Sequence, residues 1–250
     1  MLYDAYQVQS DFFAPMRAWA GLTSAVFRDS YSGPAANYFL KSISAATEMM
    51  NRARLIHDRP NYEIGTVEVD GRVVPVAEVA VLETPFATLL HFRKETNVEQ
   101  PRVLIVAPMA GHFPTLLRHT VKTMLAEHDV YITDWKNARD VPQAAGRFGT
   151  DEYIAHTIRF FEHLGPGAHV VAVCQPCAAL LATVAVMAQD NHTCQPLSMT
   201  LMAGPVDTRI NPTSVNTLAT DHPIEWFERN LITTVPRRYP GAHRRVYPGF

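Results

Sequence analysis

The chain has 250 residues, of which 47% are hydrophobic and 18% are charged, so it can bury one sizeable core. The formal net charge is −2 without any block of lysine or arginine, which excludes the basic stripe of a nucleic-acid-binding protein. Neither a secretory signal pattern nor an apolar stretch of about 18 residues is present, so a soluble cytoplasmic protein without a membrane span is expected.

Residues 1–60 are predicted to form a helical N-terminal segment. Apolar residues recur at helical spacing in a first helix, at Phe12, Phe13, Met16, Trp19 and Ala20. A second helix is expected to begin after Gly33-Pro34 and to run through Met50. Apolar stripes of this kind usually pack against the rest of a protein. A docking face is the alternative interpretation.

Residues 61–250 are predicted to form an α/β domain. Asp70-Gly71 is the dipeptide that a type I′ hairpin favours, so the domain opens with antiparallel strands. Apolar runs then alternate with helical patterns, which predicts a mostly parallel sheet with helices on both faces. The predicted strands are 103–107, 129–133, 168–173 and 197–203, and the predicted helices are 114–127, 151–164 and 176–190. Beyond residue 204, prolines divide the chain into turns and short helices, and no further buried strand is predicted.

The most informative segment lies where an apolar strand gives way to the helix 176–190. Pro176 suits the first helical position, where a missing N–H costs nothing, so Cys174 falls in the sharp strand-to-helix turn. A nucleophile elbow has its nucleophile in this turn, above the carboxyl end of the sheet. The main-chain N–H of Gln175 would face a developing oxyanion, and the positive end of the helix would favour negative charge on the sulfur. Ala172 is small enough for the motif's close packing, whereas Pro176 departs from the usual glycine.

Two other interpretations of these cysteines stay open. A cysteine at a strand end is commonly a small buried packing residue. Cys174-x-x-Cys177 also has the spacing of a dithiol redox motif at a helix start, although a thioredoxin-like domain is much smaller than this array of strands and helices. Cys177 is expected to pack inside the helix. Together with Cys194, the three cysteines do not form a disulfide framework, which fits a reducing cytoplasm.

A second segment supports the elbow interpretation. The strand 103–107 ends in Pro108-Met-Ala-Gly-His-Phe-Pro114, at the place where a nucleophile-elbow fold supplies its other oxyanion donor from a main-chain N–H. Gly111 permits close approach of the backbone, and Met109 or Ala110 is the predicted donor. A simple strand-to-helix connection is the alternative.

Several short segments form a specific combination: Val-Cys-Gln-Pro at 173–176, Gly-His-Phe at 111–113, Tyr-Ile-Thr-Asp-Trp at 131–135, Met-Ala-Gly-Pro-Val-Asp-Thr-Arg at 202–209, Tyr3-Asp-Ala-Tyr6 and Pro212-Thr-Ser-Val-Asn216. This combination, which extends over essentially the whole chain, resembles the intracellular polyhydroxybutyrate depolymerases. The resemblance implies an α/β-hydrolase fold and hydrolysis of stored poly(3-hydroxybutyrate) by a cysteine nucleophile, a histidine base and an aspartate. The nucleophile of that family corresponds to Cys174.

Members of that family extend beyond the last residue of this chain, and the resemblance places their catalytic aspartate and histidine in that further portion. The sheet is therefore expected to lack its last strands, and the 250-residue chain to be weakly active or inactive. Asp207 is expected to form a turn or an N-cap, and His222 and His243 are expected to be loop or surface residues. Asp134 is expected to be a structural cap, with Trp135 packing nearby.

The leading hypothesis is thus an ester hydrolase that acts at the surface of a polyhydroxybutyrate granule in the cytoplasm. A polyester-synthase-like acyltransferase is one alternative, although Ala172 and Pro176 fit its G-x-C-x-G motif poorly. A non-catalytic granule-binding protein, docking through residues 1–60, is the other. No His, Cys and carboxylate cluster has metal-ligand spacing and no organic cofactor motif is found, so no cofactor is expected.

Overall fold

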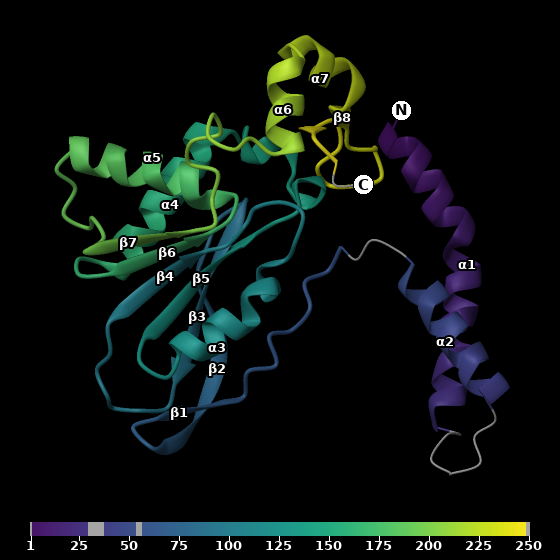
Figure 1. Ribbon diagram of the computed structural model, residues 1–250, viewed down its shortest axis with the longest axis horizontal. Coiled ribbons are helices and arrows are strands. Elements are labelled where there is room, and N and C mark those ends of the chain that lie inside the picture. Colours follow the sequence, from purple (N-terminus) through teal and green to yellow (C-terminus); the bar gives the residue numbers. More distant parts are fainter. Residues whose placement is uncertain (1, 30–37, 54–56, 249–250) are drawn as a thin grey trace.

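A computed structural model describes residues 2–29, 38–53 and 57–248 (Figure 1). Its centre is a seven-stranded sheet with the order β1-β2-β3-β5-β4-β6-β7. The strands are β1 (Thr66–Val69), β2 (Arg72–Glu83), β3 (Ala87–Lys94), β4 (Arg102–Val106), β5 (Asp129–Trp135), β6 (His169–Val173) and β7 (Ser198–Met202). Strands β5, β4, β6 and β7 are parallel, whereas the β1–β2, β2–β3 and β3–β5 pairs are antiparallel. The predicted fold class, an α/β-hydrolase-like mostly parallel sheet after a helical segment, is confirmed.

Helices cover both faces of the sheet, as the alternating sequence pattern predicted (Figure 1). One face carries α4 (Thr150–Leu164) and α5 (Pro176–Gln189), and the other carries the 3₁₀ turn η1 (Pro114–Leu117) and α3 (Arg118–Met124). Strand β4 lies between them: Leu104 packs with the α4 and α5 side, and Ile105 packs with the α3 side. Because successive side chains of a strand alternate between faces, the continuous apolar run in β4 is what two covered faces require.

The antiparallel entry to the sheet follows the predicted hairpin. Val69 pairs with Arg72, and the two turn residues between them both have positive φ, 48° at Asp70 and 74° at Gly71. A type I′ turn needs positive φ at both central positions, and its twist matches that of the flanking strands. The predicted hairpin is therefore confirmed.

Strand β5 is longer than the sequence predicted, because it pairs with β3 as far as Trp135 opposite Ala87. Asp134 consequently lies inside the strand, and its carboxylate forms an ion pair with Arg59 at 2.8 Å. The expectation that Asp134 is a cap was wrong, because the pairing of β5 with β3 was not visible in the local sequence. Trp135 packs as expected, stacked on Tyr153 with ring centroids 4.5 Å apart.

Two helices form the N-terminal segment and stand beside the sheet (Figure 1). They are α1 (Leu2–Asp29) and α2 (Tyr38–Arg52); Gly33 and Pro34, the predicted start of the second helix, lie outside the described residues. The helices approach closely where Gly21 faces Asn51, since a Cβ at Gly21 would lie 3.2 Å from the Asn51 Oδ1. Ala20 is fully buried, as expected of a packing residue. The other residues of the predicted stripe are not fully buried.

Most of the predicted packing stripe on α1 is exposed. Phe12 is 77% exposed and Trp19 is 63% exposed, and Met16 between them is exposed as well. The expectation that these side chains pack inside the chain was wrong, because α2 covers a different face of α1. None of the helices that the structure describes has the length and apolarity required to cross a bilayer.

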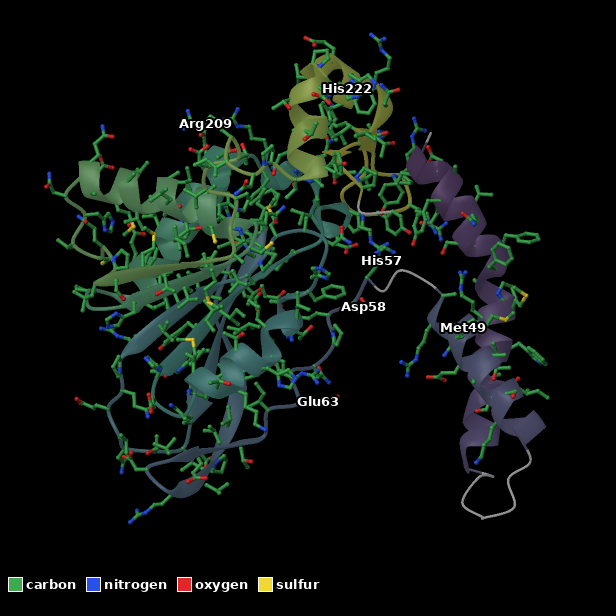
Figure 2. The ribbon with its side chains drawn as sticks, in the orientation of Figure 1. Met49, His57, Asp58, Glu63, Arg209 and His222 are labelled. Carbon is green, nitrogen blue, oxygen red and sulfur yellow. The ribbon has the colours of Figure 1, made fainter. Side chains whose placement is uncertain are left out.

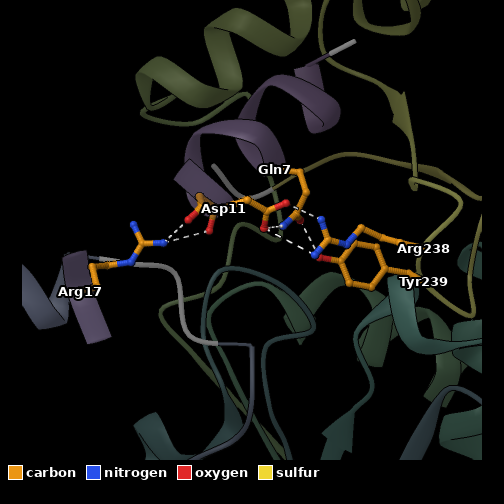
Figure 3. Close-up of polar contacts among 6 residues, drawn as sticks. Gln7, Asp11, Arg17, Arg238 and Tyr239 are labelled. Atoms are coloured by element: carbon orange, nitrogen blue, oxygen red, sulfur yellow. Dashed lines mark hydrogen bonds and ion pairs between the residues drawn. The ribbon is translucent and has the colours of Figure 1, made fainter. Parts of the chain in front are cut away.

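The C-terminal part of the chain contains α6 (Ser214–Asp221), α7 (Ile224–Asn230) and a two-stranded ribbon of β8 (Thr233–Thr234) and β9 (Arg245–Val246). Its helices follow the predicted pattern of turns and short helices. Close to the ribbon it contacts α1: Arg238 forms an ion pair with Asp11 at 2.5 Å, and the Tyr239 hydroxyl donates to the Gln7 Oε1 at 2.5 Å (Figure 3). Segments from opposite ends of the sequence are thereby joined.

The same C-terminal part packs on the connection that follows β5. The Arg244 guanidinium donates to the main-chain oxygens of Val141 at 2.6 Å and Gly146 at 2.8 Å. Gly241 approaches the 3₁₀ turn η2 (Ala138–Asp140), and its N–H donates to the Arg139 oxygen at 2.7 Å. A Cβ at Gly241 would lie 2.4 Å from the Ala138 oxygen, so only glycine fits there.

We expect Gly241→Ala to lower the free energy of unfolding by about 1–3 kcal/mol, because the added methyl forces two backbone segments apart. Urea denaturation followed by circular dichroism measures this change. Gly65→Ala is the matched control, since a Cβ at Gly65 meets nothing within 4 Å, and its effect should stay within about 0.5 kcal/mol. If the two variants were equally stable, residue 241 would have room for a methyl group, and the close approach to η2 would be wrong.

Candidate active site at the turn after β6

Cys174 occupies a strained turn between β6 and α5. Its φ is 66°, in the left-handed region that costs a side-chain-bearing residue about 1–2 kcal/mol. The Cys174 N–H donates to the Met202 oxygen at 2.8 Å, which extends the pairing of β6 with β7 by one residue. The side chain is exposed at the carboxyl edge of the parallel strands. It is therefore not the buried packing residue that one interpretation of the sequence considered.

Gly204 supplies the close approach behind this turn. A Cβ at Gly204 would lie 2.1 Å from the Cys177 Cβ and 2.9 Å from the Cys174 oxygen. The chain reaches this position from the end of β7 through Ala203, whose φ is also positive, at 53°. The sequence interpretation considered only Ala172 and Pro176 for this role. The glycine of Met202-Ala-Gly-Pro, directly after the last predicted strand, was the available signal.

Cys177 is a buried packing residue, as predicted. Its Sγ lies 3.5 Å from the Ala172 oxygen and 3.6 Å from the Met202 oxygen, beneath the turn. Burial raises the pKa of the Cys177 thiol, so this sulfur stays protonated and unreactive at neutral pH. Cys174 and Cys177 are both free thiols, one exposed and one fully buried. This difference favours a single reactive sulfur over a dithiol pair.

The loop after β4 lies against the turn. The main-chain N–H groups of Met109 and Ala110 donate to the Gln175 Oε1, at 3.1 and 3.3 Å. Gly111 follows with a φ of 85°, which lets the loop reverse direction. The structure therefore brings together the four residues selected from the sequence, Cys174, Gln175, Met109 and Ala110. The contact through the Gln175 side chain was missed, because only its main-chain N–H was considered.

Strand β5 fixes the beginning of this loop. The Ala107 N–H donates to the buried Thr133 Oγ1 at 3.0 Å, and the Trp135 Nε1 donates to the Ala107 oxygen at 3.3 Å. Pro108, directly after Ala107, is buried. The loop thus begins from a point that is held on both sides, independently of Gln175.

Within the described residues, the Gln175 main-chain N–H has no acceptor, which leaves it available to a ligand.

The residues that the sequence offered as acid and base make other contacts. The Asp207 carboxylate is exposed and pairs with Arg209, with Oδ2 and a guanidinium nitrogen 2.8 Å apart, in a turn as expected. His222 stacks on Trp226 with ring centroids 4.1 Å apart, at the C-terminal helices (Figure 2). His243 is exposed in a turn. Among the described residues, no histidine forms a hydrogen bond with Cys174, and no group of three or more His, Cys, Asp or Glu could hold a metal ion.

Another of the sequence segments has a structural explanation. Thr213 is the N-cap of α6, and the Asn216 Oδ1 accepts from the Thr213 N–H at 3.0 Å. This reciprocal capping box satisfies main-chain donors that the first turn of a helix leaves unpaired. Pro212-Thr-Ser-Val-Asn216 therefore specifies the start of α6.

Comparison with known proteins gives one family match. Residues 203–250 match the family model described as the PHB de-polymerase C-terminus. No significant match is found among curated proteins.

Solved structures share the general architecture at low similarity. The thioesterase domain from the curacin biosynthetic pathway is 16% identical with a TM-score of 0.38, and the match covers 58% of this chain and 50% of that one. A putative esterase from Staphylococcus aureus is 12% identical with a TM-score of 0.42, covering 78% and 64%. An α/β-hydrolase from the metagenome of Lake Arreo, Spain, is 15% identical with a TM-score of 0.43, covering 76% and 64%. The chain thus spans between half and two-thirds of these structures.

The mostly parallel sheet with helices on both faces, together with the exposed residue on a strained strand-to-helix turn, gives the chain an α/β-hydrolase-like fold. Within this fold, residues 203–250 are similar to the PHB de-polymerase C-terminus.

We expect Gly204→Ala to disturb the turn, because the new methyl must displace Cys177 and the first turn of α5. The loss in the free energy of unfolding should be about 1–3 kcal/mol. Combining Gly204→Ala with Cys177→Gly removes the Cβ that the methyl meets. The double variant should therefore lose less stability than the sum of the two single changes, as measured by a urea double-mutant cycle. Strict additivity would mean that the two residues are not in contact.

Proposed function

We propose that the chain acts on the ester bonds of poly(3-hydroxybutyrate) through an acyl-enzyme formed on Cys174. The observation that supports this function best is the exposed sulfur on a left-handed turn, directly beside a loop with two adjacent main-chain N–H groups. The match of residues 203–250 to the PHB de-polymerase C-terminus supports the choice of substrate.

In the proposed reaction the Cys174 Sγ attacks the ester carbonyl carbon, and a tetrahedral intermediate with a negatively charged oxygen forms. The N–H groups of Gln175 and of Met109 or Ala110 stabilise that oxygen, each contributing about 3–4 kcal/mol to the transition state. The carbon–oxygen bond of the ester then breaks, and the alcohol end of the polymer leaves with the proton that the Cys174 thiol has lost. Water afterwards hydrolyses the thioester, which releases a carboxylic acid and restores the thiol.

None of the described histidines is assigned as the general base, because none of them hydrogen-bonds to Cys174. Attack on an activated ester depends mainly on the sulfur and the oxyanion donors, whereas hydrolysis of the thioester needs a base that activates water. Acylation and turnover should therefore separate in the 250-residue chain.

We expect p-nitrophenyl butyrate to give a burst of about one p-nitrophenol per chain, followed by a turnover slower by a factor of 10³ or more than a complete triad supports. Absorbance at stopped-flow resolution measures both phases. Cys174→Ala should abolish the burst, whereas Cys177→Ala should retain it because Cys177 is buried. An undiminished burst in Cys174→Ala would remove Cys174 from the mechanism. Rapid hydrolysis of amorphous polymer by the unchanged chain would instead place a base among these residues.

We also propose that α1 contacts the polyester surface. Its exposed apolar residues are separated by three or four positions and therefore lie along one face of the helix. They are Val8, Phe12, Met16, Trp19 and Leu22, and we name them the α1 apolar face. Met49 on α2 is exposed as well (Figure 2). A contiguous apolar face on a surface helix usually marks an interaction site, and an uncharged polyester offers apolar surface to bind.

The double substitution Phe12→Ser and Trp19→Ser should reduce co-sedimentation with amorphous poly(3-hydroxybutyrate) particles at least tenfold, because it removes the two aromatic groups of the α1 apolar face. The burst with p-nitrophenyl butyrate should not change, because α1 lies outside the site. Gln9→Ser with Ala18→Ser is the control, since both side chains are exposed on α1 outside the apolar face. Undiminished sedimentation of the aromatic variant would rule out this surface.

A further inference from the structure

The two loop N–H groups, one of which the proposed function assigns as an oxyanion donor, are already occupied in this structure. The N–H groups of Met109 and Ala110 both donate to one oxygen, the Gln175 Oε1, at 3.1 and 3.3 Å. Two N–H groups converging on one oxygen form the arrangement that stabilises a tetrahedral intermediate. The oxygen belongs to the residue directly after Cys174, so it lies close to where the reacting carbonyl oxygen must be.

The beginning of the loop is held without this contact. The loop begins at Ala107, which is held by Thr133 on one side and Trp135 on the other, and Pro108 is buried. Gln175, by contrast, is exposed and makes no other hydrogen bond through its side chain within the described residues. Its carboxamide can therefore rotate into water, where its oxygen and nitrogen are again hydrogen-bonded.

We propose that the Gln175 carboxamide is a displaceable occupant of the oxyanion site, which the ester carbonyl must replace before Cys174 can attack. This inference rests on the proposed function. In the free chain the carboxamide oxygen satisfies both N–H groups. When substrate binds, the neutral ester oxygen competes with a neutral amide oxygen for the Met109 or Ala110 N–H, which weakens binding of the ester.

The competition changes once the sulfur attacks. The developing oxyanion accepts charge-assisted hydrogen bonds, which are roughly twice as strong as those to a neutral oxygen, so it holds the donors against the carboxamide. The occupant therefore costs ground-state binding and leaves the maximal rate of acylation unchanged. Removing the Gln175 carboxamide should therefore lower the ester concentration that gives half of the maximal acylation rate.

The test is single-turnover acylation by p-nitrophenyl butyrate over a range of ester concentrations. Gln175→Ala retains the main-chain N–H and removes the carboxamide. It should lower the half-saturating concentration about three- to tenfold, the effect of one hydrogen bond, with a maximal rate within about twofold. Gln175→Glu places a charged acceptor on the same donors and should raise the half-saturating concentration at least about tenfold. Gln189→Ala, an exposed glutamine at the other end of α5, should change neither quantity.

Alkylation of Cys174 by iodoacetamide, mapped by mass spectrometry, is the second measurement. Displacement on iodoacetamide forms no oxyanion, so each acylation rate is divided by the alkylation rate of the same variant to remove effects on the sulfur itself. A lower maximal rate in Gln175→Ala, at unchanged half-saturation, would overturn the proposal, because the side chain would then position the loop. Unchanged kinetics in both Gln175 variants would overturn it too. If iodoacetamide labels Cys174 in the unchanged chain and the ester does not, the proposed function itself fails and the occupant fails with it.

Discussion

The hydrogen bond from the Cys174 N–H to the Met202 oxygen, at 2.8 Å, is the contact on which the rest of the site depends. It continues the parallel pairing of β6 with β7 one residue beyond the end of β6 and holds Cys174 at a positive φ. A residue with a side chain leaves the left-handed region unless its surroundings fix it there. Gly204 completes this support, because the chain after β7 can lie against Cys177 only where no Cβ is present.

The other half of the site depends on β4 and β5. Ala107 is bonded through both its N–H and its oxygen to side chains of β5, so the loop that follows begins at a fixed place. The Gln175 carboxamide then joins this loop to the turn that carries the sulfur. The site thus combines a rigid support, provided by the four parallel strands β5, β4, β6 and β7, with one exposed side chain that can move. This division suits a site whose donors must be ready before charge develops.

Both ends of the chain pack near the site. The C-terminal part packs on the connection after β5 through Arg244 and Gly241, and it contacts α1 through Arg238 and Tyr239. The N-terminal helices are therefore attached to the α/β domain at the side where the carboxyl ends of the parallel strands lead into loops. A surface that binds polymer on α1 would thereby be connected to the part of the chain that carries Cys174.

The sequence by itself determined the elements and the place of the turn. Continuous apolar runs in β4 and β6, the Asp70-Gly71 hairpin and Pro176 at the start of α5 are local signals, because strand burial, turn conformation and helix start depend on neighbouring residues. They also selected Cys174 and the loop containing Met109. Only the tertiary structure decided the length of β5, the exposure of Phe12 and Trp19, the close approach of Gly204 and the contact of the Gln175 oxygen with the loop. Each of these depends on contacts between segments distant in sequence, and a local pattern carries no information about which distant segment will lie against it.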